Sequence, residues 1–142
     1  MWKFFIQKKM SNDLVGSLSY TYSSSKRKDA DHLSEYNFEY NQPHNLIFNA
    51  GYKISEDWQI GIKFQYATGR PYTPVADIFE KDGKYYMKEG EKNSVRYPDF
   101  HKLDIRIDRF FRFDEWTLQV FLDLWNVYNR KNIATYFWND VE

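Results

Sequence analysis

Residues 58–66 alternate strictly between apolar and polar, in the sequence WQIGIKFQY. A period of two places alternate side chains on opposite faces of a β-strand, so one face is apolar and the other polar or minimal. An aromatic residue stands at each end of the apolar face, and Lys63 stands on the polar face. This arrangement is typical of a strand that separates lipid from a polar lumen.

The same alternation recurs in five further segments, so the pattern predicts six β-strands. Most of them have roughly 10 to 13 residues, enough for a tilted crossing of a bilayer, whereas soluble strands average about 5–6 residues. The predicted strands are 2–8, 14–25, 44–54, 58–66, 102–113 and 116–126.

Short turns alternate with long polar links between these strands. The turns are at 11–13, 55–57 and 114–115, and the links are at about 26–42, at about 69–98 and from 127 onward. Outer-membrane barrels have short turns on the periplasmic side and long loops outside. We therefore predict an all-β fold, an antiparallel up-and-down meander that is part of a transmembrane β-barrel, with all 142 residues in one segment.

The second long link carries a hairpin signal of its own. Asp82-Gly83 is a strong two-residue turn, and it separates two short segments between Asp77 and Met87. We expect this hairpin to project from the barrel as an extracellular flap.

Charged residues of the fifth predicted strand, 102–113, follow its alternation with one exception. Arg109 falls on the apolar side of its strand, where we expect either snorkelling to the headgroups or a β-bulge that resets the alternation. The other charges share the lumen side, and opposite charges on neighbouring strands can pair there. These lumen-facing charges are Lys63, Asp104, Arg106, Asp108 and Asp123.

Composition excludes several classes of protein. The 20 basic and 20 acidic residues balance, so no charge excess favours nucleic acid, and the absence of cysteine excludes disulfides and thiolate metal sites. No run of about 18 apolar residues could form a transmembrane helix. The apolar stretch at 4–6 is too short for a signal peptide, so we expect any export signal upstream. Aromatic residues make up 20% of the chain, which fits interfacial girdles or an aromatic-rich soluble β-protein.

Catalytic motifs are absent from the sequence. It contains no paired-histidine zinc motif, no nucleophile-elbow serine motif and no phosphate loop, so we expect neither an enzyme nor a cofactor. His101 with Asp99 and Asp104 is a weak candidate for a metal site, since three residues at one strand start lack further ligands. A second group in the first long link is more simply solvated loop charge: Asp29, Asp31, His32 and Glu35.

Three ordered stretches resemble the C-terminal barrel of TonB-dependent outer-membrane receptors. Residues 67–74 (ATGRPYTP) resemble the point where a strand leaves that barrel, and residues 96–106 (RYPDFHKLDIR) resemble the next strand start. Residues 116–132 are similar to the family's following strand and its exit. Upstream, residues 4–9, 19–26 and 42–46 fit the preceding strands, so the resemblance spans nearly the whole chain in order.

The resemblance implies a barrel of 22 strands around a globular plug, energised by TonB through an N-terminal segment. We expect this chain to be the last third of such a barrel without its plug, N-terminal segment and closing strand, because 133–138 begins the last long loop. Its partners would then be outer-membrane lipid, the remainder of the barrel and the plug, with TonB acting through the missing N-terminal region. The whole protein would import a scarce ligand such as a ferric siderophore or a cobalamin-like compound.

Arginine and tyrosine in the outer loops suit an anionic, partly aromatic ligand. Two other functions stay open: a small complete outer-membrane barrel with a structural or adhesive role, and a soluble β-rich binding protein. The soluble form requires the apolar faces to meet in one dry core. The candidate ligand-binding residues are Arg70, Tyr72, Tyr85, Tyr86, Arg96 and Tyr97.

Overall fold

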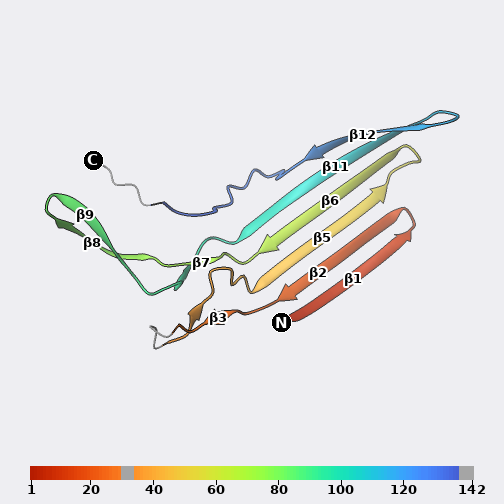
Figure 1. The fold of residues 1–142 in the computed structure, drawn as a ribbon. Coiled ribbons are helices and arrows are strands. Elements are labelled where there is room, and N and C mark those ends of the chain that lie inside the picture. Colours follow the sequence, from red (N-terminus) through yellow and green to blue (C-terminus); the bar gives the residue numbers. More distant parts are fainter. Residues whose placement is uncertain (30–33, 138–142) are drawn as a thin grey trace.

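The computed structural model describes residues 1–29 and 34–137, and these residues form an all-β structure (Figure 1). They contain no helix, and therefore none long and apolar enough to cross a membrane. The long strands are β1 (Trp2–Ser11), β2 (Leu14–Tyr22), β5 (His44–Lys53), β6 (Trp58–Ala67), β11 (Phe100–Arg112) and β12 (Thr117–Leu124). The shorter ones are β3 (Lys26–Arg27), β4 (Tyr36–Asn37), β7 (Pro71–Tyr72), β8 (Val75–Lys81), β9 (Lys84–Glu89) and β10 (Val95–Arg96).

The six long strands form one sheet in the order β1-β2-β5-β6-β11-β12, and every neighbouring pair is antiparallel. The predicted meander is therefore confirmed. The predicted strand over 14–25 is shorter in the structure, because the chain leaves the sheet after Tyr22 to form β3 and β4. Two small pairings were not predicted from the sequence, β3 with β4 and β7 with β10.

Side chains of one kind lie next to each other across the whole sheet, because the register from β2 to β12 contains no shift. Ile60 is paired with Tyr52 on one side and with Ile107 on the other, and Ile107 is paired with Leu122. Most apolar residues of the six strands thus share a single face, and most polar residues share the other. Apolar residues on the polar face include Phe5, Val15, Ile47 and Phe121. No side chain on the apolar face is buried, so no described residue covers that face.

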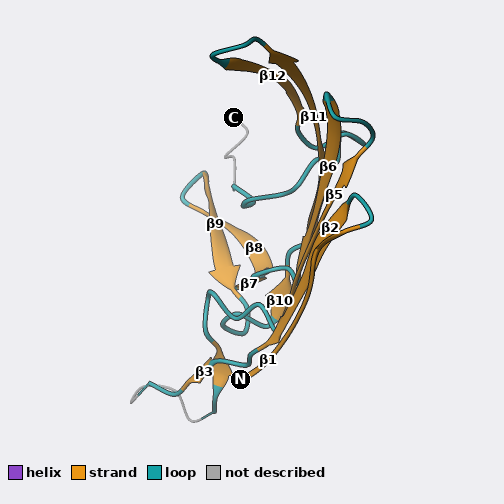
Figure 2. Ribbon diagram, turned by 90° about the vertical axis from the view of Figure 1, so that its right-hand side faces the viewer, coloured by secondary structure: helices purple, strands orange, loops and turns teal. Residues whose placement is uncertain are grey.

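The hairpin turns advance from one hairpin to the next. Leu14, at the end of the first hairpin, pairs with Tyr52, but the next hairpin continues two residues further, to Ile54. Trp58 pairs with Arg109, but the last hairpin continues four residues further, to Phe113. The turns thus advance by six residues along the strands for every four strands across the sheet. At ~3.3 Å per residue and ~4.8 Å between strands, the strands are tilted by roughly 45° from the perpendicular to the line that joins the turns. Figure 1 shows the turns stepping obliquely to the strands, and Figure 2 shows that the sheet is curved.

Two basic residues occupy apolar-face positions, and both lie near the hairpin turns. Lys8 donates to the backbone oxygens of Ser11 and Leu14, at 3.0 and 3.3 Å. The Arg109 guanidinium lies 3.3 Å from the Asp57 carboxylate and over the Trp58 ring, 4.9 Å from its centre. The ladders on both sides of Arg109 are continuous, so the expected alternative of a β-bulge is wrong.

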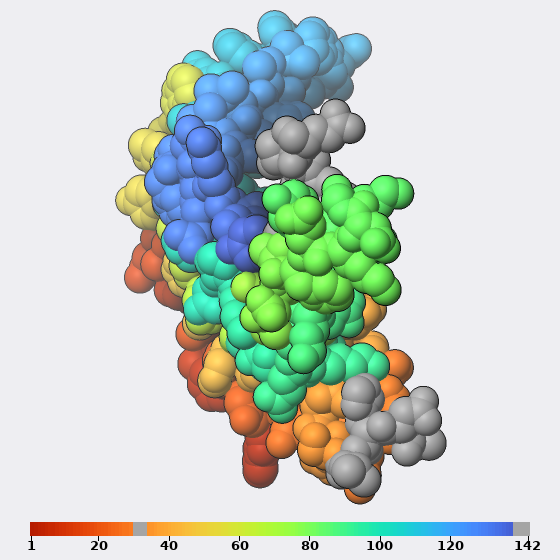
Figure 3. Space-filling view, turned by 90° about the vertical axis from the view of Figure 1, so that its left-hand side faces the viewer, coloured from red at the N-terminus to blue at the C-terminus, as the bar shows by residue number. Residues whose placement is uncertain are grey.

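The hairpin expected in the second long link is confirmed as β8–β9, and its extracellular position stays a prediction. Its turn consists of Asp82 and Gly83, both with positive φ (55° and 72°), as a two-residue hairpin turn requires. The hairpin projects from the loop end of the sheet, and in Figure 3 it stands in front of the other loops in green. Every residue of both strands is exposed.

Candidate functional site

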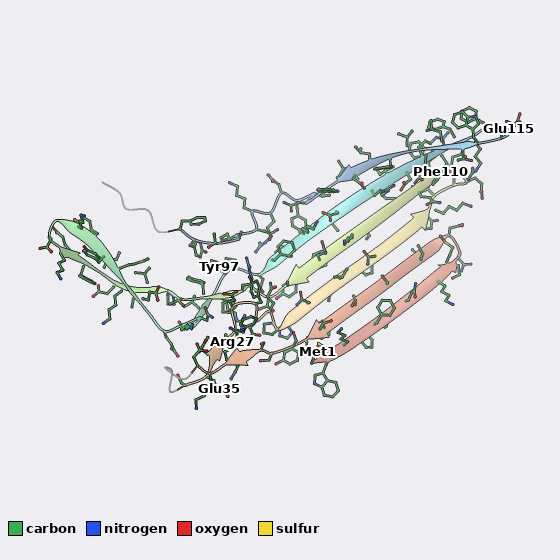
Figure 4. All side chains as sticks on the ribbon, viewed as in Figure 1. Met1, Arg27, Glu35, Tyr97, Phe110 and Glu115 are labelled. Atoms are coloured by element: carbon green, nitrogen blue, oxygen red, sulfur yellow. The ribbon has the colours of Figure 1, made fainter. Side chains whose placement is uncertain are left out.

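Two loop segments, at 69–70 and 96–98, cross at the loop end of the sheet, near Tyr97 in Figure 4. The crossing depends on Gly69, which is buried directly beneath the backbone of Tyr97 and Pro98. A Cβ atom at Gly69 would lie 1.7 Å from the Tyr97 carbonyl oxygen, so no residue with a side chain fits this position. The Tyr97 amide in turn donates to the Arg70 carbonyl at 2.9 Å.

Asp99 fastens this crossing to the sheet. Its carboxylate accepts a hydrogen bond from the Tyr66 hydroxyl at 2.6 Å and another from the Gly69 amide at 2.9 Å. The Tyr66 hydroxyl and then the Gly69 amide hold the pKa of the Asp99 carboxyl below its usual value, and the nearby Arg130 acts in the same direction.

Arg96 is part of this framework. Its Nη1 donates to the carbonyl of Gly69 at 2.9 Å and to the carbonyl of Asn41. Asn41 is only 3% exposed, so the guanidinium is directed into the loops and away from solvent. The expectation that Arg96 meets a ligand receives no support from this geometry, because its hydrogen bonds position the backbone.

Three tyrosines gather beside the crossing and form a cluster of rings. Tyr72 stacks on Tyr97 with ring centres 4.5 Å apart, and Tyr136 lies 5.6 Å from Tyr72 and 5.1 Å from Tyr97. The Tyr97 hydroxyl lies 3.2 Å from the Thr135 hydroxyl, so the segment after β12 is held against β7 and β10. Tyr72 lies on β7, and Tyr97 directly follows β10, the partner of β7 in the unpredicted pair.

A hollow of about 420 Å³ opens beside this ring cluster. Arg70 lines it, donating to the Ala134 carbonyl at 3.2 Å while its guanidinium lies 5.8 Å from the centre of the Tyr40 ring. The arrangement offers a cation, aromatic faces and hydroxyl groups, which suit non-covalent binding of an anionic or aromatic ligand. The residues lining it are Glu39, Tyr40, Arg70, Pro71, Tyr72, Thr73, Asn93, Tyr97, Ala134 and Thr135.

The structure therefore brings together Arg70, Tyr72 and Tyr97 of the six loop residues predicted to meet a ligand. Tyr85 and Tyr86 lie on β9 in the projecting hairpin and do not line this hollow. The sequence analysis did not identify Tyr40 and Tyr136 as members of this site. Each lies 30 or more residues in sequence from the residue that it contacts, Arg70 or Tyr72, and no local motif marks them.

The predicted lumen-facing charges lie together on the polar face of the sheet. The Arg106 guanidinium lies 3.0 Å from Asp108 and 3.7 Å from Asp123 on the neighbouring strand, which confirms pairing across strands. Lys63 is paired in register with Asp104, and Asp104 forms its ion pair with Lys102 at 2.8 Å. A second hollow, of about 400 Å³, is lined in part by Lys63, Asp104, Arg106 and Asp123.

The weak metal candidates have other contacts in the structure. The His101 ring lies 2.7 Å from the Tyr128 hydroxyl, and Asp104 accepts from the Asn126 amide at 2.9 Å. Within residues 1–29 and 34–137, no group of three or more histidine, aspartate or glutamate side chains is placed to hold a metal ion. Asp31 and His32 lie outside the described residues.

Comparison of the chain with protein-family models, with curated proteins and with solved structures gives no match. The resemblance to TonB-dependent receptors therefore rests on the ordered sequence motifs alone.

Replacing Gly69 by alanine should open the loop crossing. The backbone contact of 1.7 Å cannot be relieved by rotating a side chain, so we expect a cost of about 2 kcal/mol or more, measured as lost hydrogen-exchange protection of the Tyr97 amide. Gly61→Ala is the matched control, because its added Cβ would meet nothing closer than 3.9 Å. Equal protection in both variants would contradict the close approach at Gly69.

Acid should loosen the same crossing through Asp99. A carboxyl whose pKa is lowered on folding contributes stability above its unfolded pKa of about 3.9, and this contribution is lost as the pH falls through the lower folded value. We expect protection of the Gly69 amide, corrected for intrinsic exchange, to fall below about pH 4. Asp99→Asn removes the titrating group, so the fall should flatten; an unchanged profile would assign the pH dependence to another group.

Proposed function

We propose that this chain forms wall and outer loops of an outer-membrane β-barrel that imports a scarce ligand, in the manner of a TonB-dependent receptor. This proposal rests on the continuous apolar face of six paired strands, which no described segment covers. Each large apolar side chain left in water forgoes ~1.5–3 kcal/mol, so the uncovered face forgoes tens of kcal/mol. A typical domain is stable by only ~5–15 kcal/mol, so this face needs an apolar environment.

The distribution of aromatic residues supports lipid as that environment. Trp2, Tyr20 and Tyr66 lie toward the loop end of the apolar face, and Tyr52 and Trp58 lie toward the turn end, with aliphatic side chains and phenylalanine between them. Eight residues separate Trp58 from Tyr66, about 26 Å along the strand and about 20 Å along the normal at the estimated tilt. The apolar band between the aromatic girdles of outer-membrane barrels is ~25 Å tall.

The polar ends of the interfacial residues fit the same orientation. The Tyr20 hydroxyl lies 2.7 Å from His44 Nδ1, and the Tyr66 hydroxyl donates to Asp99, so both point to the polar loops. At the other end, Lys8 and Arg109 direct their charges to the turns. Side chains with an apolar body and a polar tip are typical of a membrane–water interface.

The two outer edges of the sheet call for further strands. β1 and β12 each pair on one side only, and all of their residues are exposed. Because lipid offers no hydrogen bonds, open strand edges in a bilayer have to be paired by other strands. The remainder of a barrel, as the family resemblance implies, would supply them, with a plug against the polar face and TonB acting through the N-terminal region.

The ring cluster of Tyr72, Tyr97 and Tyr136, together with Arg70, gives the proposed importer a ligand-contacting surface at its outer end. A ferric siderophore or a similar anionic chelate suits these groups, since the guanidinium pairs with anionic oxygens and the rings stack on planar groups. A structural or adhesive barrel would share the same apolar face, and the transport assay below separates it from an importer.

An arginine on the apolar face should block membrane assembly. At Ile62, midway between the aromatic rows, Ile62→Arg should cost about 2–4 kcal/mol, whereas Gln65→Arg on the polar face should cost little. We expect the full-length Ile62→Arg protein to be depleted from the outer-membrane fraction and the Gln65→Arg protein to be retained. Equal retention of both variants would remove the case for a lipid-facing surface.

Uptake of a radiolabelled ferric chelate by cells carrying the full-length protein tests the transport proposal. We expect accumulation that stops when TonB is deleted or the proton-motive force is collapsed. Arg70→Ala should lower uptake about tenfold, as expected for a lost charge-assisted contact, with Arg70→Lys intermediate and membrane levels unchanged. If a panel of ferric and cobalamin-like ligands shows no energy-dependent uptake, the structural or adhesive function would replace transport.

A further inference from the structure

The β8–β9 hairpin carries apolar side chains on both of its faces and packs neither against the sheet. Ile78 and Met87 are 47% and 48% exposed on one face, and Phe79 and Tyr86 are 47% and 45% exposed on the other. A two-stranded hairpin is marginally stable alone, and exposed apolar surface of this kind marks a contact with another molecule. A single partner surface would cover one face only.

The two faces differ in charge. The register places Asp77, Phe79, Lys81, Lys84, Tyr86 and Lys88 on what we term the basic face. Three lysines and one aspartate give this face a formal charge of +2. Val75, Ile78, Glu80, Tyr85, Met87 and Glu89 lie on the acidic face, where two glutamates give a charge of −2. None of the three lysines forms an ion pair with another described residue.

We propose that the hairpin is a self-association element, with the basic face of one copy packing on the acidic face of the same hairpin in a neighbouring copy. Successive cross-strand pairs of the hairpin lie on alternate faces. When one copy is shifted by one residue relative to its neighbour, each pair on its basic face therefore lies over a pair on the neighbour's acidic face. At the tip, Lys81 then lies over Glu80 of the neighbouring copy and forms an ion pair with it. Lys84 lies over Tyr85 of that neighbouring copy and forms a cation–π contact. The stacked rings of Phe79 and Tyr86, 5.8 Å apart, lie over Ile78 and Met87.

The match continues at the base of the hairpin, where Lys88 lies over Glu89 of the neighbour. Opposite charges thus occupy both ends of the contact and apolar groups its centre. Packing of like faces would instead oppose lysine to lysine or glutamate to glutamate, which is unfavourable. The contact is heterologous, so each copy offers one face to each of two neighbours and rows or rings can form.

The contact is small, because each hairpin contributes about six side chains, fewer than the ~20–30 residues a side of a standard interface. Confinement of parallel copies to one membrane plane raises their effective concentration and presents all hairpins in the same direction. In this respect the inference rests on the proposed membrane location.

Cysteine crosslinking between copies in the native membrane tests the inference, since this chain contains no cysteine of its own. Full-length Tyr86→Cys and Met87→Cys proteins, carrying different tags, would be coexpressed and treated with a bis-maleimide about 10 Å long, the spacing of packed sheets. We expect a mixed dimer of the two tagged proteins. Tyr86→Cys coexpressed with itself is the matched control and should give about tenfold less, because basic faces do not meet.

Charge reversal gives the second arm of the test. Lys81→Glu and Glu80→Lys should each lower the mixed crosslink about two- to fivefold, and both changes in the same chain should restore it. Equal crosslinking in the face-matched and control pairs, or no restoration by the double change, would overturn self-association and leave the hairpin to another partner. Absence of the protein from the membrane fraction would instead overturn the proposed function, so the two failures are distinguishable.

Discussion

The apolar face of the six-stranded sheet sets the conditions for the rest of the structure. The backbone of the long strands is paired within the sheet, apart from the register shift near the end of β1 and the outer edges of β1 and β12. The side chains of the apolar face and those two edges are therefore what must find partners. Water cannot satisfy so large an apolar face, and lipid cannot satisfy the open edges. In the barrel that we propose, a bilayer would meet the first demand and further strands beside β1 and β12 the second.

The loops take their positions from the same sheet. The tilt of the strands, together with the long links at one end, brings segments from three parts of the chain to the loop end, where Gly69 lets two of them cross in direct contact. Asp99, Arg96 and Asn41 fix that crossing, and Tyr72, Tyr97 and Tyr136 pack above it. The hollow beside Arg70 therefore has a wall held by hydrogen bonds, a rigidity that the proposed ligand binding would need.

The sheet could be predicted from the sequence because its signal is local. Alternation along residues such as Trp58, Ile60 and Ile62 fixes the face of each side chain, and the short turns fix which strands are neighbours. Asp82-Gly83 likewise identified the outer hairpin. The loop site was predicted only in part, because its members meet through contacts distant in sequence. Nothing near Arg96 shows that its guanidinium is used by Gly69 and Asn41, and nothing near Tyr136 shows that it reaches Tyr72.

Arg109 shows how a single misfit can be resolved only in three dimensions. Its position suggested either a bulge or snorkelling to headgroups. The continuous ladder excludes the bulge, and the guanidinium reaches Asp57 at the turn, as snorkelling would require. Asn132 is a comparable case at the other end of the sheet. Its side-chain amide exchanges hydrogen bonds with the backbone of His101, at 3.2 and 3.0 Å, and so replaces a strand where β12 has ended.

Cysteine accessibility along β6 in the native membrane tests the central claim most directly. Single cysteines would replace each residue from Gln59 to Gln65 in the full-length protein and be labelled with a membrane-impermeant maleimide after the outer membrane is made permeable to it. We predict alternation, with labelling at 59, 61, 63 and 65 and protection at 60, 62 and 64. Uniform labelling at all seven positions would show that water reaches both faces, and the lipid-facing sheet would then be wrong.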